Sequence, residues 1–456
     1  MDAIFELYTC AQHVYVPDVP VTGRGAVIST FSVCFPRDHH FYFKAQQGLN
    51  IVTMDEQETP PSENDQVRKV ISLPIPKDVG TDYNLERWWK GWQGDLERIK
   101  VHFESYIINR RAAGLEDPAL IDNFLQHPVI RRVLPVVRMS VKPFVVNTKD
   151  NTIVVINCLG NIEHLKLARV LKSGELLMYY FVTAEYFFKQ VLEQERRTGK
   201  MSGVTLIYDL FGLKVLDYLN PFSAIMQIFA LGSTVIQEYY CELLTNLFII
   251  NPGPFVKLAF TLVKSLLVPR TLQKVRVLSG DSWKSKLCEY VSADALPVQF
   301  GGTWTEIQEG IDPLTCCTVN TPIQESLYFQ PKLVKEYHTV YLKPRKLYEV
   351  DVQVQAGSTL FWQFFCTGKF TFTIIYKNND GNDQPELMLP RLVMITPMGS
   401  EMPEEGTLLC KRTGIYTMEF ASVGNSYFST RLDYAYQMMC HMVIIEMNID
   451  NLICNA

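Results

Sequence analysis

Apolar residues in the first quarter of the chain change from no clear period to a helical one. Residues 1–60 carry no regular pattern, and the stretch 59–65, read as TPPSEND, has the composition of a loop or linker. Between residues 82 and 111, apolar residues recur at helical spacing on two faces, with Gly94-Asp95 between them. This pattern predicts a helical hairpin that begins a small helical region reaching residue 124.

From about residue 140, short β-branched and apolar runs alternate with helical patterns. Strands separated by helices of this length are typical of parallel βαβ units, so the pattern predicts an α/β domain. The predicted strands are 152–157, 203–209, 247–251 and 273–278, and the predicted helices are 162–197, a long region reaching Glu242, and 255–267.

Beyond residue 320 the runs become short, often alternate between apolar and polar residues, and are separated by turn residues. This texture predicts an all-β module of the sandwich type. The predicted strands are 339–342, 348–355, 359–365, 370–376, 407–410, 414–420 and 442–447.

Composition narrows the class of protein. The 456 residues are 47% hydrophobic and 20% charged, which excludes a mainly disordered chain and leaves room for about two to four domains. With 43 basic and 48 acidic residues, nucleic-acid binding has no electrostatic support. The stretch 203–302 is more apolar than the rest, yet Glu238 and Glu242 interrupt its best window and Asn251-Pro252-Gly253-Pro254 ends it, so we expect no membrane span.

Cysteine usage and the N-terminus indicate a compartment. Eleven cysteines include no CxxC pair, no Asn-x-Ser/Thr sequon occurs, and the first residues lack the basic start of a signal peptide. We therefore expect a reduced, cytoplasmic protein. Motifs for serine hydrolases, phosphate-binding loops, dinucleotide binding and zinc are missing, and His39-His40 is a weak metal hint, so we expect neither an enzyme nor a metal or cofactor.

The most specific strings end the predicted α/β region. Residues 269–278 read PRTLQKVRVL and residues 296–302 read LPVQFGG, while Tyr240-Cys241-Glu242 lies upstream. Together they resemble the CRAL-TRIO lipid-binding family, and residues 82–102 resemble its helical lead-in. The β module resembles a GOLD domain on the strength of WQF at 362–364, GTL at 406–408 and GIY at 414–416, as in the supernatant protein factor and tocopherol-associated group.

The resemblance implies an α/β CRAL-TRIO lipid-binding domain with a helical N-terminal lead-in, followed by an all-β GOLD-type sandwich. The expected divisions are an unassigned extension (1–66), the helical region (67–125), the lipid-binding domain (126–303), a linker (304–330), the sandwich (331–447) and a tail (448–456).

The predicted helix 255–267 is amphipathic, which by itself is most simply an ordinary helix packed on a sheet. The resemblance implies instead that it is the gate of a lipid pocket, hinged at Asn251-Pro252-Gly253-Pro254. The expected pocket and gate residues are Tyr208, Phe248, Ile250, Phe255, Leu258, Ala259, Leu262, Val263 and Leu266.

Residues 254–290 carry seven basic and two acidic side chains in a chain of net charge −5. A solvated face is one interpretation, and docking on an anionic membrane surface is the other, which the neighbouring gate favours. The predicted docking patch comprises Lys257, Lys264, Arg270, Arg276, Lys284 and Lys286.

Glu242 and Lys274 match head-group positions of the family's phosphatidylinositol-transfer members, although a structural ion pair explains them equally well. Lys214 lies where those members supply hydroxyl side chains. A lysine at this position is more like the family group that is associated with tocopherol or squalene. The expected ligand is therefore a hydrophobic lipid: phosphoinositide, tocopherol or squalene-like.

Two functions follow as hypotheses. The first is an intracellular lipid-transfer protein that holds one lipid in a gated apolar pocket and exchanges it during transient contact with membranes. The alternative is a membrane-traffic adaptor whose GOLD sandwich binds protein partners while the lipid pocket is vestigial or only a sensor.

Overall fold

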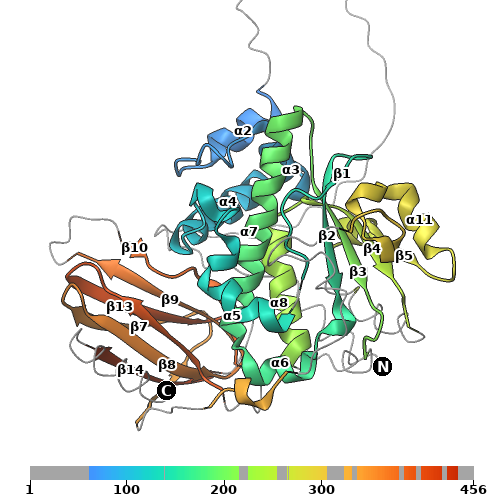
Figure 1. Cartoon of the computed structure of the whole chain (residues 1–456). Helices are drawn as coiled ribbons and strands as arrows, with labels where there is room; N and C mark the ends of the chain where they lie inside the picture. The colour runs from blue at the N-terminus through green and yellow to red at the C-terminus, as the bar shows by residue number, and fades with distance from the viewer. Residues whose placement is uncertain are drawn as a thin grey trace, which may run out of the picture.

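The computed structural model describes residues 61–137, 139–214, 224–253, 264, 267–305, 323–330, 336–378, 385–396, 402–423 and 429–439. A central group of helices separates a mostly parallel sheet from a pair of antiparallel sheets (Figure 1). No helix within these ranges combines the length and the apolar character needed to cross a bilayer.

The helical region begins with α2 (Glu63–Val70), α3 (Asp82–Gly91) and α4 (Leu96–Ala112). The side chains of Ser62, Thr81 and Asp95 accept hydrogen bonds from backbone N–H groups in the first turns, which fixes where these helices start. The predicted hairpin over residues 82–111 is confirmed. The region ends with η2 (Pro118–Leu120), η3 (Phe124–Gln126) and α5 (Pro128–Val137).

The predicted α/β unit is also confirmed. Its sheet has the order β1-β2-β3-β4-β5, in which β2 to β5 run parallel and β1 is antiparallel to β2. The strands are β1 (Val146–Asn147), β2 (Thr152–Cys158), β3 (Val204–Asp209), β4 (Leu244–Ile250) and β5 (Val275–Leu278). The accompanying helices are η4 (Leu159–Asn161), α6 (His164–Val170), α7 (Ser173–Thr198), α8 (Ala224–Tyr239), α10 (Pro269–Leu272), α11 (Trp283–Tyr290), η6 (Ala293–Ala295) and η7 (Val298–Phe300).

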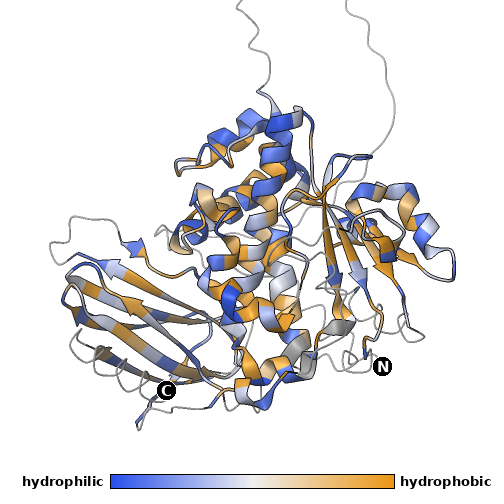
Figure 2. Ribbon diagram, in the orientation of Figure 1, coloured by the Kyte–Doolittle hydropathy of each residue, from blue (hydrophilic) through white to orange (hydrophobic). Residues whose placement is uncertain are grey.

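The two faces of the parallel sheet pack against different helices. On one face, Ile156, Ile207 and Phe248 pack in a core with Leu287 of α11 and with Val291, which directly follows α11. The residues that alternate with them along the strands face α7 and α8. Figure 2 shows apolar residues along these strands, as expected for strands covered on both faces.

The closing Gly-Gly string has a steric explanation. Gly301 adopts φ +90°, which L side chains rarely adopt, and a Cβ on Gly302 would clash with the carbonyl oxygen of Leu296. The string therefore makes a tight turn, after which Trp304 forms an isolated β-bridge with Pro297.

The C-terminal part consists of two antiparallel sheets, with the orders β10-β9-β13-β7 and β12-β8-β14-β6, and with β11 on β9. Phe364 of one sheet lies against Phe372 and Phe420 of the other, with ring centroids 4.8 and 5.1 Å apart. The elements are η9 (Glu325–Leu327), β6 (His338–Leu342), β7 (Leu347–Val354), β8 (Thr359–Cys366), β9 (Lys369–Lys377), β10 (Glu386–Leu387), β11 (Leu392–Ile395), β12 (Glu404–Leu409), β13 (Gly414–Ser422) and β14 (Thr430–Met439).

The prediction that this part is all-β is confirmed, but not every strand was predicted. The sequence pattern did not predict β10, β11 or β14, and the predicted strand 442–447 lies outside the described residues.

The β sheets contact the helical layer through buried polar groups. The Glu404 carboxylate accepts hydrogen bonds from the Ser173 hydroxyl (2.6 Å) and the Gly174 N–H (3.2 Å) at the start of α7. The Arg391 N–H donates to the Asn109 side chain of α4 at 2.8 Å. The antiparallel sheets are therefore joined to α7, which covers the parallel sheet, and to α4 of the helical region.

Candidate functional site

Two adjoining cavities lie between the parallel sheet and helices α7 and α8. Their volumes are about 260 and about 230 Å³. We name the first the ionic cavity, because Glu242, Arg270 and Lys274 line it, and the second the neutral cavity. Both are lined mainly by apolar side chains. Their common wall consists of Leu159, Tyr180, Leu206, Tyr208, Phe229, Ile236 and Leu244.

Strand β4 contributes alternate residues to the ionic cavity. Leu247 and Ile249 line it, whereas Phe248 and Ile250 are fully buried in the core on the α11 face. The prediction that Phe248 and Ile250 line the pocket is therefore wrong. The reason is geometric: successive side chains of a strand point to opposite faces, so the neighbouring residues take the pocket positions.

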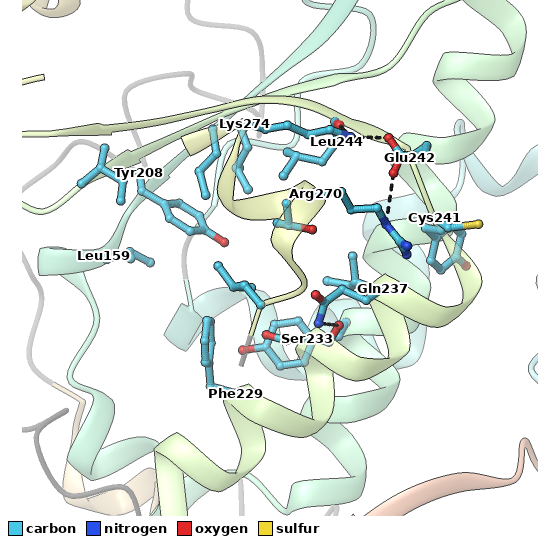
Figure 3. A pocket seen from close by; sticks show the side chains of 18 of the residues that line it. Leu159, Tyr208, Phe229, Ser233, Gln237, Cys241, Glu242, Leu244, Arg270 and Lys274 are labelled. Carbon is cyan, nitrogen blue, oxygen red and sulfur yellow. Dashed lines mark hydrogen bonds and ion pairs between the residues drawn. The ribbon is translucent and has the colours of Figure 1, made fainter. Parts of the chain in front are cut away.

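Tyr208, which the sequence analysis assigned to the lipid pocket, lines both cavities from β3, and its side chain extends into the ionic cavity (Figure 3). Burial raises the pKa of the Tyr208 hydroxyl above its ordinary value, with a smaller contribution from Tyr180. The phenol is therefore a neutral hydrogen-bonding group at any physiological pH.

Glu242 forms the centre of the ionic group. It follows α8 with a positive φ of 59°, an uncommon backbone conformation for a residue with a side chain. Its carboxylate lies 2.7 Å from Lys274 Nζ and 3.1 Å from Arg270 Nε (Figure 3). Lys274 also donates to the Leu244 carbonyl oxygen at 2.6 Å, and Arg270 donates to the Gly91 carbonyl oxygen.

The three charged side chains of the ionic group are thus already paired with one another. Side-chain exposures of 20–28% leave it partly accessible, and two cations share one carboxylate. An anionic ligand group would have to compete with Glu242 for Lys274 and Arg270. Of the three predicted head-group residues, Glu242 and Lys274 come together, whereas Lys214 is exposed and lines neither cavity.

The predicted docking patch is divided between different surfaces. Arg270 belongs to the ionic group and not to an outer surface. Arg276 stacks over Tyr290, 5.2 Å from the ring centroid, and donates to Asn246. Lys284 and Lys286 are exposed on α11, across the sheet from the cavities. Lys264 is exposed.

Most of the predicted gate falls outside the described residues. This applies to the gate residues Phe255, Leu258, Ala259, Leu262, Val263 and Leu266, and also to Lys257 of the predicted docking patch. Leu267, at the end of that segment, lines the ionic cavity. The gating role of residues 255–267 stays a prediction.

Sequence reasoning missed the polar residues of the neutral cavity. Asn157 and Thr183 line it beside Tyr179 and Tyr180. The only signal in the sequence was an asparagine within the β-branched run TIVVIN and a threonine one helical turn after Tyr179-Tyr180. Within the described ranges, His, Cys, Asp and Glu side chains form no group of three that could hold a metal ion.

Comparison with known proteins agrees with this architecture. The model of the CRAL/TRIO domain matches residues 143–302. A CRAL-TRIO domain-containing protein of Caenorhabditis elegans is 25% identical over 373 residues, covering 79% of this chain and 90% of the relative.

Two further relatives match smaller shares of the chain. The phosphatidylinositol/phosphatidylcholine transfer protein SFH4 of Arabidopsis thaliana is 29% identical over 239 residues, covering 52% of this chain and 38% of its own length. The Sec14 cytosolic factor of Schizosaccharomyces pombe is 29% identical over 155 residues, covering 34% of this chain and 52% of its own length. The region that holds the parallel sheet, its covering helices and the closing Gly-Gly turn, residues 143–302, is thus similar to the CRAL/TRIO domain.

Proposed function

We propose that this protein binds one lipid molecule in its two adjoining cavities and transfers it between membranes. The observation that carries the proposal is the pair of apolar cavities with a common wall between the sheet and helices α7 and α8. Such a space removes a hydrocarbon chain from water, which contributes about 0.8 kcal/mol per buried methylene. The transfer function named for the Arabidopsis relative supports the same conclusion.

Charge is confined to one end of this space. Glu242, Arg270 and Lys274 line the ionic cavity, whereas the neutral cavity has no charged lining residue among the described ones. An amphiphilic ligand fits that distribution, because its chain and its polar part need different surroundings. Membrane docking, gating by residues 255–267 and partner binding through a GOLD domain at residues 331–447 remain predictions.

Leu206→Trp tests the proposal, because Leu206 forms part of the wall common to both cavities. The larger side chain should fill the cavities and reduce lipid uptake from vesicles at least tenfold. Leu347→Trp is the matched control, since Leu347 is 53% exposed on β7 of the sandwich. Mass spectrometry of copurifying lipid and radiolabelled lipid uptake provide the readouts, with thermal unfolding to verify that both variants fold.

A wild-type protein that neither copurifies with lipid nor takes it up would contradict the proposal, as would equal uptake by the two variants. The same pair of variants addresses the adaptor hypothesis. If Leu206→Trp abolished lipid uptake but left cellular localisation and partner binding intact, the sandwich would act independently of the cavity.

A further inference from the structure

Strand β11 of the antiparallel sheets is held at both ends by side chains of the helices. Directly before its first residue, the Arg391 N–H donates to Asn109 Oδ1 of α4 at 2.8 Å. At its end, the Ser173 hydroxyl at the start of α7 donates to the Ile395 carbonyl oxygen. Asn109 and Ser173 are each only 2% exposed, so both hydrogen bonds are shielded from water. We name these two side chains and the backbone groups that they bind the β11 clamp.

Between its two ends, β11 pairs with β9 and packs against α7 and α8. Its residues Leu392, Met394 and Ile395 are buried. They belong to the same apolar core as Val235 and Tyr239 of α8. Protein interiors are close-packed and transmit strain, so a shift of α7 or α8 must disturb the contact with β11.

The clamp and the two cavities use neighbouring residues of the same helices. Asn109 Nδ2 donates to the Tyr239 hydroxyl at 2.7 Å, and the next residue, Tyr240, lines the ionic cavity. On α7, Leu176 lies three residues after Ser173, one helical turn along, and it lines the neutral cavity. Each end of the clamp is therefore within one helical turn of a residue that a bound lipid would contact.

We propose that the β11 clamp positions α7 and α8 as walls of the lipid site, so that lipid binding and attachment of the antiparallel sheets stabilise each other. This inference rests on the proposed lipid-binding function and adds a positioning role for Asn109 and Ser173, neither of which lines a cavity.

The direction of the coupling follows from the closed state. Both cavities are present while the clamp is closed, so the attached form is the one that accepts lipid. Opening the clamp would release α8 from β11 and allow its apolar side chains to move into the space that the lipid needs. Linkage then requires that lipid stabilises the closed clamp by the same factor by which the closed clamp raises lipid affinity.

Hydrogen exchange of the full-length chain measures one side of this linkage, because the Arg391 amide exchanges only when its bond to Asn109 opens. The protein is compared after delipidation and after loading from vesicles of a total cellular lipid extract. We expect lipid to slow exchange of the Arg391 amide about tenfold, within the range of typical coupling energies. Amides that pair β13 with β7 inside the antiparallel sheets should exchange at the same rate in both samples.

Two variants open the clamp from different ends. Asn109→Ala removes the acceptor for the Arg391 amide. Gly174→Leu acts as a wedge, because a Cβ at position 174 would lie 2.7 Å from the Glu404 carboxylate and 3.2 Å from the Met394 sulfur. Leucine favours a helix more than glycine does, so α7 should still form in the second variant. Both variants should take up about tenfold less lipid from the same vesicles, quantified by mass spectrometry.

Tyr348→Phe is the matched control, since it removes a hydrogen bond to the Tyr434 hydroxyl (2.9 Å) within the antiparallel sheets. It should retain wild-type uptake and the lipid-dependent exchange of the Arg391 amide. In Gly174→Leu, by contrast, exchange of that amide should no longer depend on lipid. A merely structural contact would not produce this difference, and thermal unfolding verifies that each variant folds.

The outcomes separate this inference from the function on which it depends. If lipid is bound but leaves exchange of the Arg391 amide unchanged or makes it faster, the proposed coupling is overturned and lipid binding stands. The same holds if lipid slows exchange equally throughout the antiparallel sheets, or if both clamp variants take up as much lipid as Tyr348→Phe. If the wild type takes up no lipid of any kind, the proposed function fails together with this inference.

Discussion

Glu185 provides the sharpest test of how the helical region is held against the cavity helices. It lies on α7 with 0% exposure and accepts hydrogen bonds from Arg110 Nε (2.8 Å), the Tyr106 hydroxyl (2.9 Å) and the Tyr240 hydroxyl (2.8 Å). Burial is the main cause that raises the pKa of both tyrosines, and the Glu185 charge adds to it. One carboxylate thus links α4, α7 and the segment after α8.

The change Glu185→Gln keeps the shape of the side chain and removes its charge. Arg110, which is also 0% exposed, would then lose its buried counter-ion. Removing one partner of a buried pair costs about 3–5 kcal/mol. Asp78 remains paired with Arg110 and is itself 45% exposed, so we expect the lower end, about 3 kcal/mol, or roughly a 100-fold shift toward the unfolded state.

Glu193→Gln is the matched control on the same helix. Its partner Arg196 is 74% exposed, and exposed pairs contribute about 0–1 kcal/mol. Urea unfolding of both variants, followed by tryptophan fluorescence, compares the two free energies, and Trp88 reports locally because it stacks on Phe103 at 4.6 Å. If Glu185→Gln cost no more than Glu193→Gln, the argument from burial would be refuted.

Three further predictions concern the helices around the cavities. Burial raises the pKa of Glu238 to about 7, so the stability that this group contributes is full below its unfolded pKa of about 4.5 and is lost as pH rises through 7. Because the side chain is 23% exposed, we expect Glu238→Gln to stabilise the protein by about 2 kcal/mol at pH 8 relative to pH 5; melting shifts of equal size at both pH values would contradict this. In Gly232→Ala, the added Cβ would lie 2.5 Å from the Tyr180 ring, so thermal unfolding should reveal a loss of about 1–2 kcal/mol and vesicle assays a lower lipid uptake. Unchanged stability and uptake would show that the ring moves aside and would contradict this prediction. Glu404→Ala should leave the Ser173 hydroxyl without its carboxylate partner and weaken the contact between α7 and the antiparallel sheets by about 1–3 kcal/mol. Faster proteolysis between the helical part and the antiparallel sheets would reveal this loss, and unchanged proteolysis would argue against it.

Local patterns were sufficient to predict most of the α/β region. The helical hairpin over residues 82–111 follows from apolar spacing and from Gly94-Asp95, which separates its two helices. The parallel strands follow from short β-branched runs between long helices. The closing string at residues 296–302 indicated the resemblance to the CRAL-TRIO family, because its two glycines meet a steric requirement of the turn.

Some predictions of single helices and strands failed. The pattern 162–197 predicted one helix, whereas the chain forms α6 and α7 with a break at Leu171-Lys172, where the backbone becomes extended. Strand β14 was missed although polar residues such as Arg431 and Asp433 alternate with apolar ones such as Leu432, a pattern typical of a strand, and its backbone pairs with both β6 and β8.

The candidate site depended on tertiary structure to a greater degree. The run LFII in β4 is apolar on both faces, so its sequence has no alternation to separate Ile249, which lines the cavity, from Phe248, which packs beside α11. Arg270 looked like part of a basic surface, yet the fold brings Glu242 to within 3.1 Å of it.

The sequence by itself therefore determined most element types, the similarity of residues 143–302 to the CRAL/TRIO domain and the presence of an unusually apolar segment, because these depend on local spacing and sterics. The tertiary structure alone decided which side chains face the cavities and which charges pair. These properties depend on groups far apart in the chain, such as Asn157 and Thr183, whose shared environment exists only when β2 and α7 pack together.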